Sequence, residues 1–192
     1  MESGTLVRVA KARLADGRLD VRYKIWDVVR GQDLGGQSLA VPLADMRLAA
    51  HRVADAIYER FTGDKGVFAT RIAYVTRASG SAGRFTLRIT DADGEGGQVA
   101  LTSVEPIISP AWSPDGRELA YVSFESQKAV VWVQDVASGQ RRKIADFRGS
   151  NSAPAWSPDG QQLVLTLSRD GGSQLYAIAR AGGTPRRLTQ SA

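Results

Sequence analysis

Cysteine is absent from the 192 residues of this chain, and histidine occurs once, as His51. Without thiols the chain has no disulfide framework and no cysteine-based zinc site, and its redox compartment is left open. A single imidazole offers little for metal or acid–base chemistry, so we expect no metal, no cofactor and no catalytic residue. The sequence also lacks Gly-x-Ser-x-Gly and Gly-x-x-x-x-Gly-Lys-Ser/Thr, the motifs of serine hydrolases and phosphate-binding loops.

Long apolar runs and clustered charge are missing as well. No stretch approaches the roughly 20 apolar residues of a membrane span, and the first five residues have neither the basic nor the apolar region of a signal peptide. The net charge is +5, but the basic residues are dispersed, and no stripe of alternating basic and aromatic residues accompanies the densest groups, Arg141-Arg142-Lys143 and Arg186-Arg187. We therefore expect neither a membrane span nor a nucleic-acid partner.

Glycine is abundant, with 20 residues, and apolar residues alternate in the manner of strands. Alternation on both sides of Asp16-Gly17 predicts a β-hairpin over residues 6–28, because both residues tolerate the positive φ of a tight turn. A turn-like stretch at residues 30–36 then leads to a third strand at residues 38–41, which Pro42 ends.

Between residues 43 and 62 the apolar period changes to that of a helix. The predicted apolar stripe consists of Met46, Ala50, Val53, Ala54, Ile57 and Phe61. Gly63 predicts the end of this helix, since glycine adopts a left-handed backbone at little cost. We expect His51 to serve helix packing or a domain contact. Residues 1–66 should thus form the C-terminal part of a small α/β domain made of a hairpin, a strand and a helix.

A repeat of 44 residues dominates the rest of the chain. Trp-Ser-Pro-Asp-Gly occurs twice, starting at Trp112 and Trp156, and the apolar segments that follow align at the same offset. Units of this length with four short strands are typical of β-propeller blades. A weaker copy, at residues 72–76 and 87–91, lacks the tryptophan strand. The sequence therefore predicts a mainly β protein, in which residues 67–192 form a partial β-propeller of about three blade units, two of them clear.

The repeated motif has a structural explanation. Proline presets φ, aspartate bonds the local backbone and glycine leaves the turn, which suits a type I turn. The preceding indole can fill the wedge between adjacent blades, so Trp112 and Trp156 should be structural. Asp91 and Asp93 are spaced like the start of a calcium loop, but the later ligands are missing, and we interpret this segment as a turn.

The junction at residues 50–75, together with residues 109–116 and 124–126, closely resembles the TolB family of the Gram-negative Tol-Pal system. The resemblance covers nearly the whole chain. It implies a non-enzymatic periplasmic scaffold with an α/β domain and a six-bladed propeller. The implied partner is the peptidoglycan-associated lipoprotein Pal, which would place the protein at the outer membrane and link it to membrane integrity and cell division. Against that family we expect this chain to be a fragment without the segment that meets TolA.

The resemblance also implies a partner-binding site. In the family, the loop that leads into a blade helps to form the Pal-facing end of the propeller. The corresponding residues here are Ser150, Asn151, Ser152, Ala153 and Pro154, with Ile108 and Ser109 as weaker candidates in the preceding unit. Ser150 stands where some members have histidine. For Asn151 and Ser152, a turn that bonds itself explains the sequence equally well.

The repeat leaves hypotheses of other classes open. Similar blades occur in the propeller domains of prolyl-oligopeptidase-type hydrolases, whose catalytic domain would lie outside this chain. A stand-alone propeller-like module is a third possibility. The open reading frame discriminates among them, because a downstream Gly-x-Ser-x-Gly domain would favour the hydrolase and further blades the scaffold.

Overall fold

The structure is a computed structural model that describes residues 4–80 and 83–190. The chain divides into two compact units. The first unit comprises Met1–Arg71 with the turn Asp91–Glu95, and the second comprises Ile72–Thr90 and Gly96–Ala192. Each unit has its own hydrophobic core, as expected for separately packed bodies.

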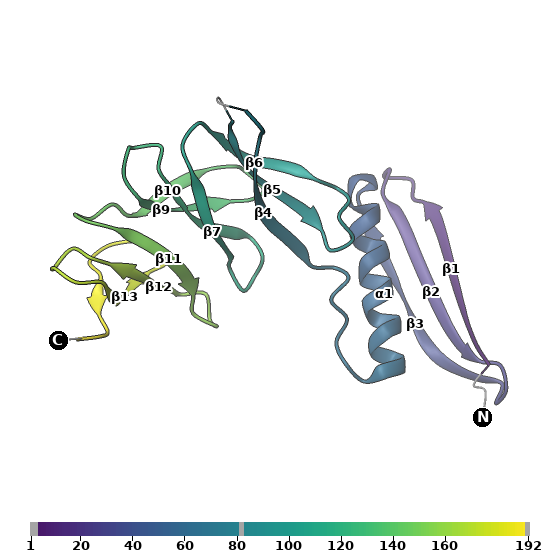
Figure 1. Ribbon diagram of the computed structural model, residues 1–192. Helices are drawn as coiled ribbons and strands as arrows, with labels where there is room; N and C mark the ends of the chain where they lie inside the picture. Colours follow the sequence, from purple (N-terminus) through teal and green to yellow (C-terminus); the bar gives the residue numbers. More distant parts are fainter. Residues whose placement is uncertain (1–3, 81–82, 191–192) are drawn as a thin grey trace. The chain divides into compact units, whose positions relative to one another are not determined.

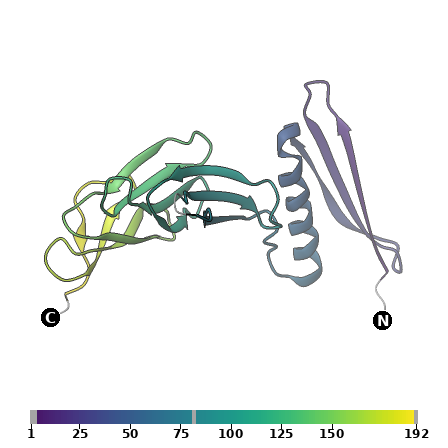
Figure 2. The ribbon, with the colours of Figure 1, turned by 45° about the horizontal axis from the view of Figure 1, so that its top comes forward.

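The first unit is a three-stranded antiparallel sheet with one helix against one of its faces (Figures 1 and 2). Its elements are β1 (Thr5–Arg13), β2 (Leu19–Asp27), β3 (Gln32–Val41), a short 3-10 turn (Leu43–Asp45) and α1 (Met46–Thr62). The predicted end of the helix is confirmed, because Gly63 has φ +81° and its N–H donates to the Glu59 carbonyl at 2.9 Å. In the described part of the chain, no helix has the length and apolar character needed to cross a membrane.

Strand β3 is longer than predicted. It begins at Gln32, so Gly35 and Gly36 of the predicted turn-like stretch lie within the strand, while Gly31 lies in the turn before it. A Cβ at Gly36 would come within 2.2 Å of the Tyr23 carbonyl oxygen, and Gly35 has φ +105° beside a register shift in β2. Glycine is present here because the strands approach closely and bulge, which sequence alone does not distinguish from a turn.

The buried stripe of α1 also differs from the prediction. Ala49 and Val53 are buried against β2 and β3, with Ile57 partly buried beside them. Met46 and Phe61, predicted to face the core, are exposed. The reason is that α1 packs mainly on β2 and β3, so a narrower stripe than the full apolar period is buried.

The second unit contains three antiparallel sheets, which we call the first, second and third blades (Figure 1). The first blade has three strands, β4 (Arg71–Arg77), β5 (Phe85–Asp91) and β6 (Gln98–Ser103). The second has four, β7 (Ile107–Trp112), β8 (Glu118–Ser123), β9 (Val130–Asp135) and β10 (Arg141–Ala145). The third has β11 (Asn151–Trp156), β12 (Gln162–Leu167), β13 (Gln174–Ala179) and β14 (Arg186–Arg187). The predicted mainly β fold with three blade units is confirmed.

Strand β8 is buried on both faces, which explains its nearly continuous apolar sequence. Leu119 and Tyr121 pack toward the first blade, while Ala120 and Val122 pack toward the third. The alternation of a strand therefore divides its side chains between two inter-blade cores.

The two Ser-Pro-Asp-Gly turns form as predicted. The Gly116 N–H donates to the Ser113 carbonyl at 2.8 Å, and the Gly160 N–H donates to the Ser157 carbonyl at 2.9 Å. Both glycines have positive φ at the exit of the turn. The repeated motif is thus a structural device that reverses the chain between the first two strands of a blade.

Candidate functional site

The candidate site consists of the leading loops, which we define as residues 107–110 of the second blade and residues 148–154 of the third. In both blades the pairing register shifts at this point, between Ile108 and Ala111 and between Ser152 and Ala155. Ser109 and Ala153 have φ of 53° and 50°, values that residues with a side chain rarely adopt. The same strained bulge therefore recurs at the same place in neighbouring blades.

The candidate residues divide into an exposed set and a buried set. Ser109, Ser150 and Ala153 are exposed, and 42% of Ile108 is accessible to solvent. Ser152 is half-buried, whereas Asn151 and Pro154 are buried. The surface that the leading loops offer is made by small side chains and bulged backbone, with Ile108 as its largest apolar group.

Asn151 is 0% exposed, so its side chain is not presented to a partner as the resemblance implied. Its Oδ1 accepts the Phe147 N–H at 3.0 Å, and its Nδ2 donates to the carbonyls of Ala129 and Phe147, both at 3.0 Å. A buried amide must find such partners, and here they lie on two neighbouring blades. Asn151 fixes the shape of the loop from inside.

Gly149 fixes the same loop by what it lacks. Its φ is +78°, and a Cβ there would come within 2.5 Å of the Ser168 hydroxyl oxygen. That hydroxyl accepts the Ser150 N–H at 2.8 Å. Sequence reasoning missed Ser168, because no local motif connects it with a loop 18 residues earlier.

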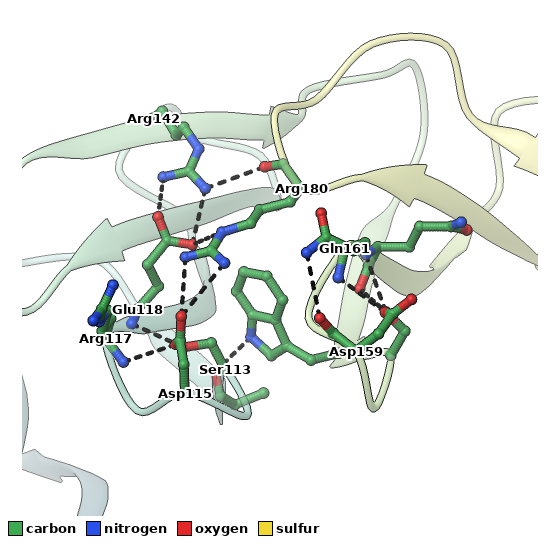
Figure 3. Close-up of polar contacts among 12 residues, drawn as sticks. Ser113, Asp115, Arg117, Glu118, Arg142, Asp159, Gln161 and Arg180 are labelled. Atoms are coloured by element: carbon green, nitrogen blue, oxygen red, sulfur yellow. Dashed lines mark hydrogen bonds and ion pairs between the residues drawn. The ribbon is translucent and has the colours of Figure 1, made fainter.

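A charge network joins the second and third blades, as Figure 3 shows. Glu118 is only 7% exposed, and its carboxylate accepts from Arg142 Nη1 at 2.6 Å and from Arg180 Nε at 2.9 Å. Arg142 Nη2 also donates to the Arg180 carbonyl at 3.1 Å. Two guanidinium groups offset the desolvation of one carboxylate, so the network fixes the angle between two blades.

The tryptophan prediction is confirmed at the same interface. The Trp156 Nε1–H donates to the Ala111 carbonyl of the second blade at 3.1 Å, and the ring packs on the core between the two blades. The Ser113 hydroxyl and the Arg117 N–H hold the pKa of Asp115 below its ordinary value. This carboxylate serves the turn and contacts Arg180 at 3.4 Å, in agreement with its interpretation as a turn former.

His51 lies beside the two aspartates of the predicted turn in the first compact unit. Its Nε2 is 3.4 Å from an Asp93 carboxylate oxygen and 3.7 Å from an Asp91 carboxylate oxygen. One possible metal-ligating atom from each of the three residues lies within 4.8 Å of the other two. Arg47 donates to the carboxylates of Asp91 and Asp93, at 3.1 and 2.7 Å. The guanidinium thereby offsets the negative charge that would attract a metal cation. The Glu95 N–H, followed by Arg47, holds the pKa of Asp93 below its ordinary value.

The comparisons with known proteins agree with these features. A family model described as the TolB beta propeller domain matches residues 58–192. The chain belongs to the TolB family. A Tol-Pal system protein TolB from Albidiferax ferrireducens is 68% identical over 149 residues, which are 78% of this chain and 34% of that protein. The chain therefore spans about a third of the length of this curated TolB relative.

Solved structures place the fold in the same family. The crystal structure of TolB from Acinetobacter baumannii has a TM-score of 0.84 and 40% identity, and the match covers 96% of this chain and 46% of that one. The isopeptidase AtxE2 has a TM-score of 0.51 and 14% identity over 64% of this chain and 28% of its own. The second likeness shows the fold alone, whereas the first relates 96% of this chain to part of a TolB structure.

Proposed function

We propose that this chain is part of a non-enzymatic periplasmic scaffold of the Tol-Pal system, which binds the lipoprotein Pal and supports outer-membrane integrity and cell division. The observation that carries the proposal is the TolB-family match over residues 58–192. The likeness to an isopeptidase extends to the fold only, so it does not favour the hydrolase alternative.

The leading loops are the proposed contact with Pal. Ser109 and Ala153 are exposed at equivalent positions of adjacent blades, and both have a positive φ within a bulged strand. Because Asn151 and Gly149 fix the loop before any partner arrives, binding would cost little conformational entropy. Small side chains at the two bulges would let a partner approach the backbone closely, and Ile108 would supply apolar contact.

The test is calorimetric titration of the 192-residue chain with the soluble domain of Pal. Replacing Ala153 or Ser109 by arginine puts a large charged group on the proposed surface, and we expect each variant to bind at least about tenfold more weakly, or 1.4 kcal/mol. Gln162→Arg is the matched control, because Gln162 is exposed at the opposite end of β12 from the residue paired with Asn151.

The proposal also makes clear which results would contradict it. Failure of the unaltered chain to bind Pal would remove the function. Equal weakening by Ala153→Arg and Gln162→Arg would remove the site, because a general effect of added charge would then explain the loss. Circular dichroism of each variant confirms that the blades remain folded before affinities are compared.

A further inference from the structure

The face of the β1–β2–β3 sheet that points away from α1 combines positive charge with apolar side chains. Residues directly opposite each other in antiparallel strands share a face, and the register pairs Leu6 with Trp26 and Arg8 with Lys24. Arg22 follows on the same face of β2, since it alternates with Val21 and Tyr23 of the helix-facing core. We call Leu6, Arg8, Arg22, Lys24 and Trp26 the basic face.

The basic face is open to solvent. The Arg22 side chain is 70% exposed, and Trp26 is 36% exposed although tryptophan is rarely left uncovered. The Lys24 ammonium lies 4.9 Å from the centre of the Trp26 ring. Next to this pair is a shallow hollow of about 550 Å³, lined by Arg8, Arg22 and Lys24 and rimmed by the β3 glycines. The surface therefore has an aromatic group, three cations and a concavity.

The carboxylates near the basic face only partly balance its charge. Asp20 is buried and accepts hydrogen bonds from Ser38 and Arg22, so its charge is not presented to solvent. Asp33 pairs with Lys24 at 3.0 Å. Among residues 4–80 and 83–190, no carboxylate pairs with Arg8, whose guanidinium offers five donors. Arg8 and the outward N–H groups of Arg22 are thus available to an anionic group.

We propose that the basic face is a docking surface for an acidic segment of a partner protein. Charge complementarity selects an anion, and the mixture of tryptophan, arginine and aliphatic groups matches the composition of protein interfaces. The exposed carboxylate of Asp33 would be repelled by the dense charge of a lipid surface or a nucleic acid. A peptide segment can instead place its carboxylates against Arg8 and Arg22 and a donor against Asp33. The surface lies within residues 6–38 of the β1–β2–β3 sheet, so it does not depend on Pal binding by the leading loops.

The test measures binding of a fluorescein-labelled ten-residue peptide of alternating glutamate and serine to the 192-residue chain by fluorescence anisotropy. The triple variant Arg8→Glu, Arg22→Glu, Lys24→Glu should bind at least tenfold more weakly than the unaltered chain. The matched control reverses three other cations of the first unit, Arg52→Glu, Arg60→Glu and Lys65→Glu, which are exposed. Its net charge changes equally, so we expect less than twofold weakening.

A milder variant guards against loss of folding, because reversing Arg22 removes the ion pair with Asp20. Arg8→Gln disturbs no ion pair in the described residues and should weaken peptide binding about threefold, or 0.7 kcal/mol. Equal loss in the triple variant and its control would overturn the proposal, as would absence of peptide binding by the unaltered chain. Tighter binding of phosphatidylglycerol vesicles, lost in the same triple variant, would reassign the surface to lipid and also overturn it.

Discussion

The second and third blades repeat one sequence pattern yet hold themselves together with different chemistry. Glu118 of the second blade is buried between two arginines, while Gln162, its equivalent 44 residues later, is exposed. Trp112 and Trp156, by contrast, are kept at the repeat spacing. Positions that shape the backbone are repeated, whereas positions that meet a neighbouring blade vary with that neighbour.

The leading loops differ in the same way. Ile107 begins β7 and is 1% exposed in an apolar core, while the equivalent Asn151 begins β11 and is buried as an amide. Both residues anchor a bulged loop, one by packing and the other by hydrogen bonds. Through the Asn151 amide, the leading loop of the third blade is bonded to Ala129 of the second blade. Packing alone would not select this one partner.

Replacing Asn151 by alanine should have the largest effect on this comparison. The change leaves the Phe147 N–H and the Ala129 carbonyl without their partner, which should lower the free energy of unfolding by about 2–3 kcal/mol. Urea denaturation measures the loss. Ile107→Val should cost about 1 kcal/mol, and a larger loss there than at Asn151 would show that packing anchors the loops more strongly.

Converting Glu118 to glutamine gives the second blade the chemistry of the third. We expect a loss of about 1–2 kcal/mol, because Arg142 and Arg180 lose a charged acceptor but remain about one-third exposed to solvent. The reverse change, Gln162→Glu, should alter stability by less than about 0.5 kcal/mol. Equal losses of unfolding free energy in Glu118→Gln and Gln162→Glu would mean that the buried carboxylate of Glu118 does not stabilise the contact between the blades.

Acid should destabilise the second blade through Glu125, by less than the substitutions at Asn151 and Glu118 do. Glu125 accepts from Arg141 Nη2 at 2.5 Å, which holds the pKa of Glu125 below its ordinary value, while the equivalent residue of the third blade is Arg169 and not a carboxylate. A lowered carboxyl pKa stabilises the fold above the ordinary pKa, and this contribution is lost as pH falls through the lowered value. The free energy of unfolding should therefore fall less between pH 7 and acid in Glu125→Gln than in the unaltered chain, by a difference of less than about 1 kcal/mol. Urea denaturation at the two pH values measures it. Arg169→Gln should change the pH dependence less than Glu125→Gln, because the Tyr176 hydroxyl, more than Arg169, holds the pKa of Asp170 below its ordinary value.

Local features of this fold were predictable from sequence, and features that join distant residues were not. The hairpin at Asp16-Gly17, the helix end at Gly63 and both Ser-Pro-Asp-Gly turns follow from conformational preferences of a few adjacent residues. The exposure of Met46 was missed, because an apolar period does not reveal how much of a helix the sheet covers.

The candidate site shows the same limit. The resemblance pointed to the leading loops as a candidate site, but the burial of Asn151 and the support from Ser168 depend on side chains brought together only by folding. Arg180 and Glu118 are 62 residues apart, and their pairing has no signature in either segment. Strain at Ser109 and Ala153 was equally hidden, since neither residue type announces a left-handed backbone.

The indole of Trp156 has a consequence for how the chain assembles. Its N–H is satisfied by Ala111, which lies in β7 and leaves the ribosome 45 residues earlier. A third blade without the second would have to leave that donor to water and expose the ring. The second blade is thus a template for the third, which should gain its order once the second has formed.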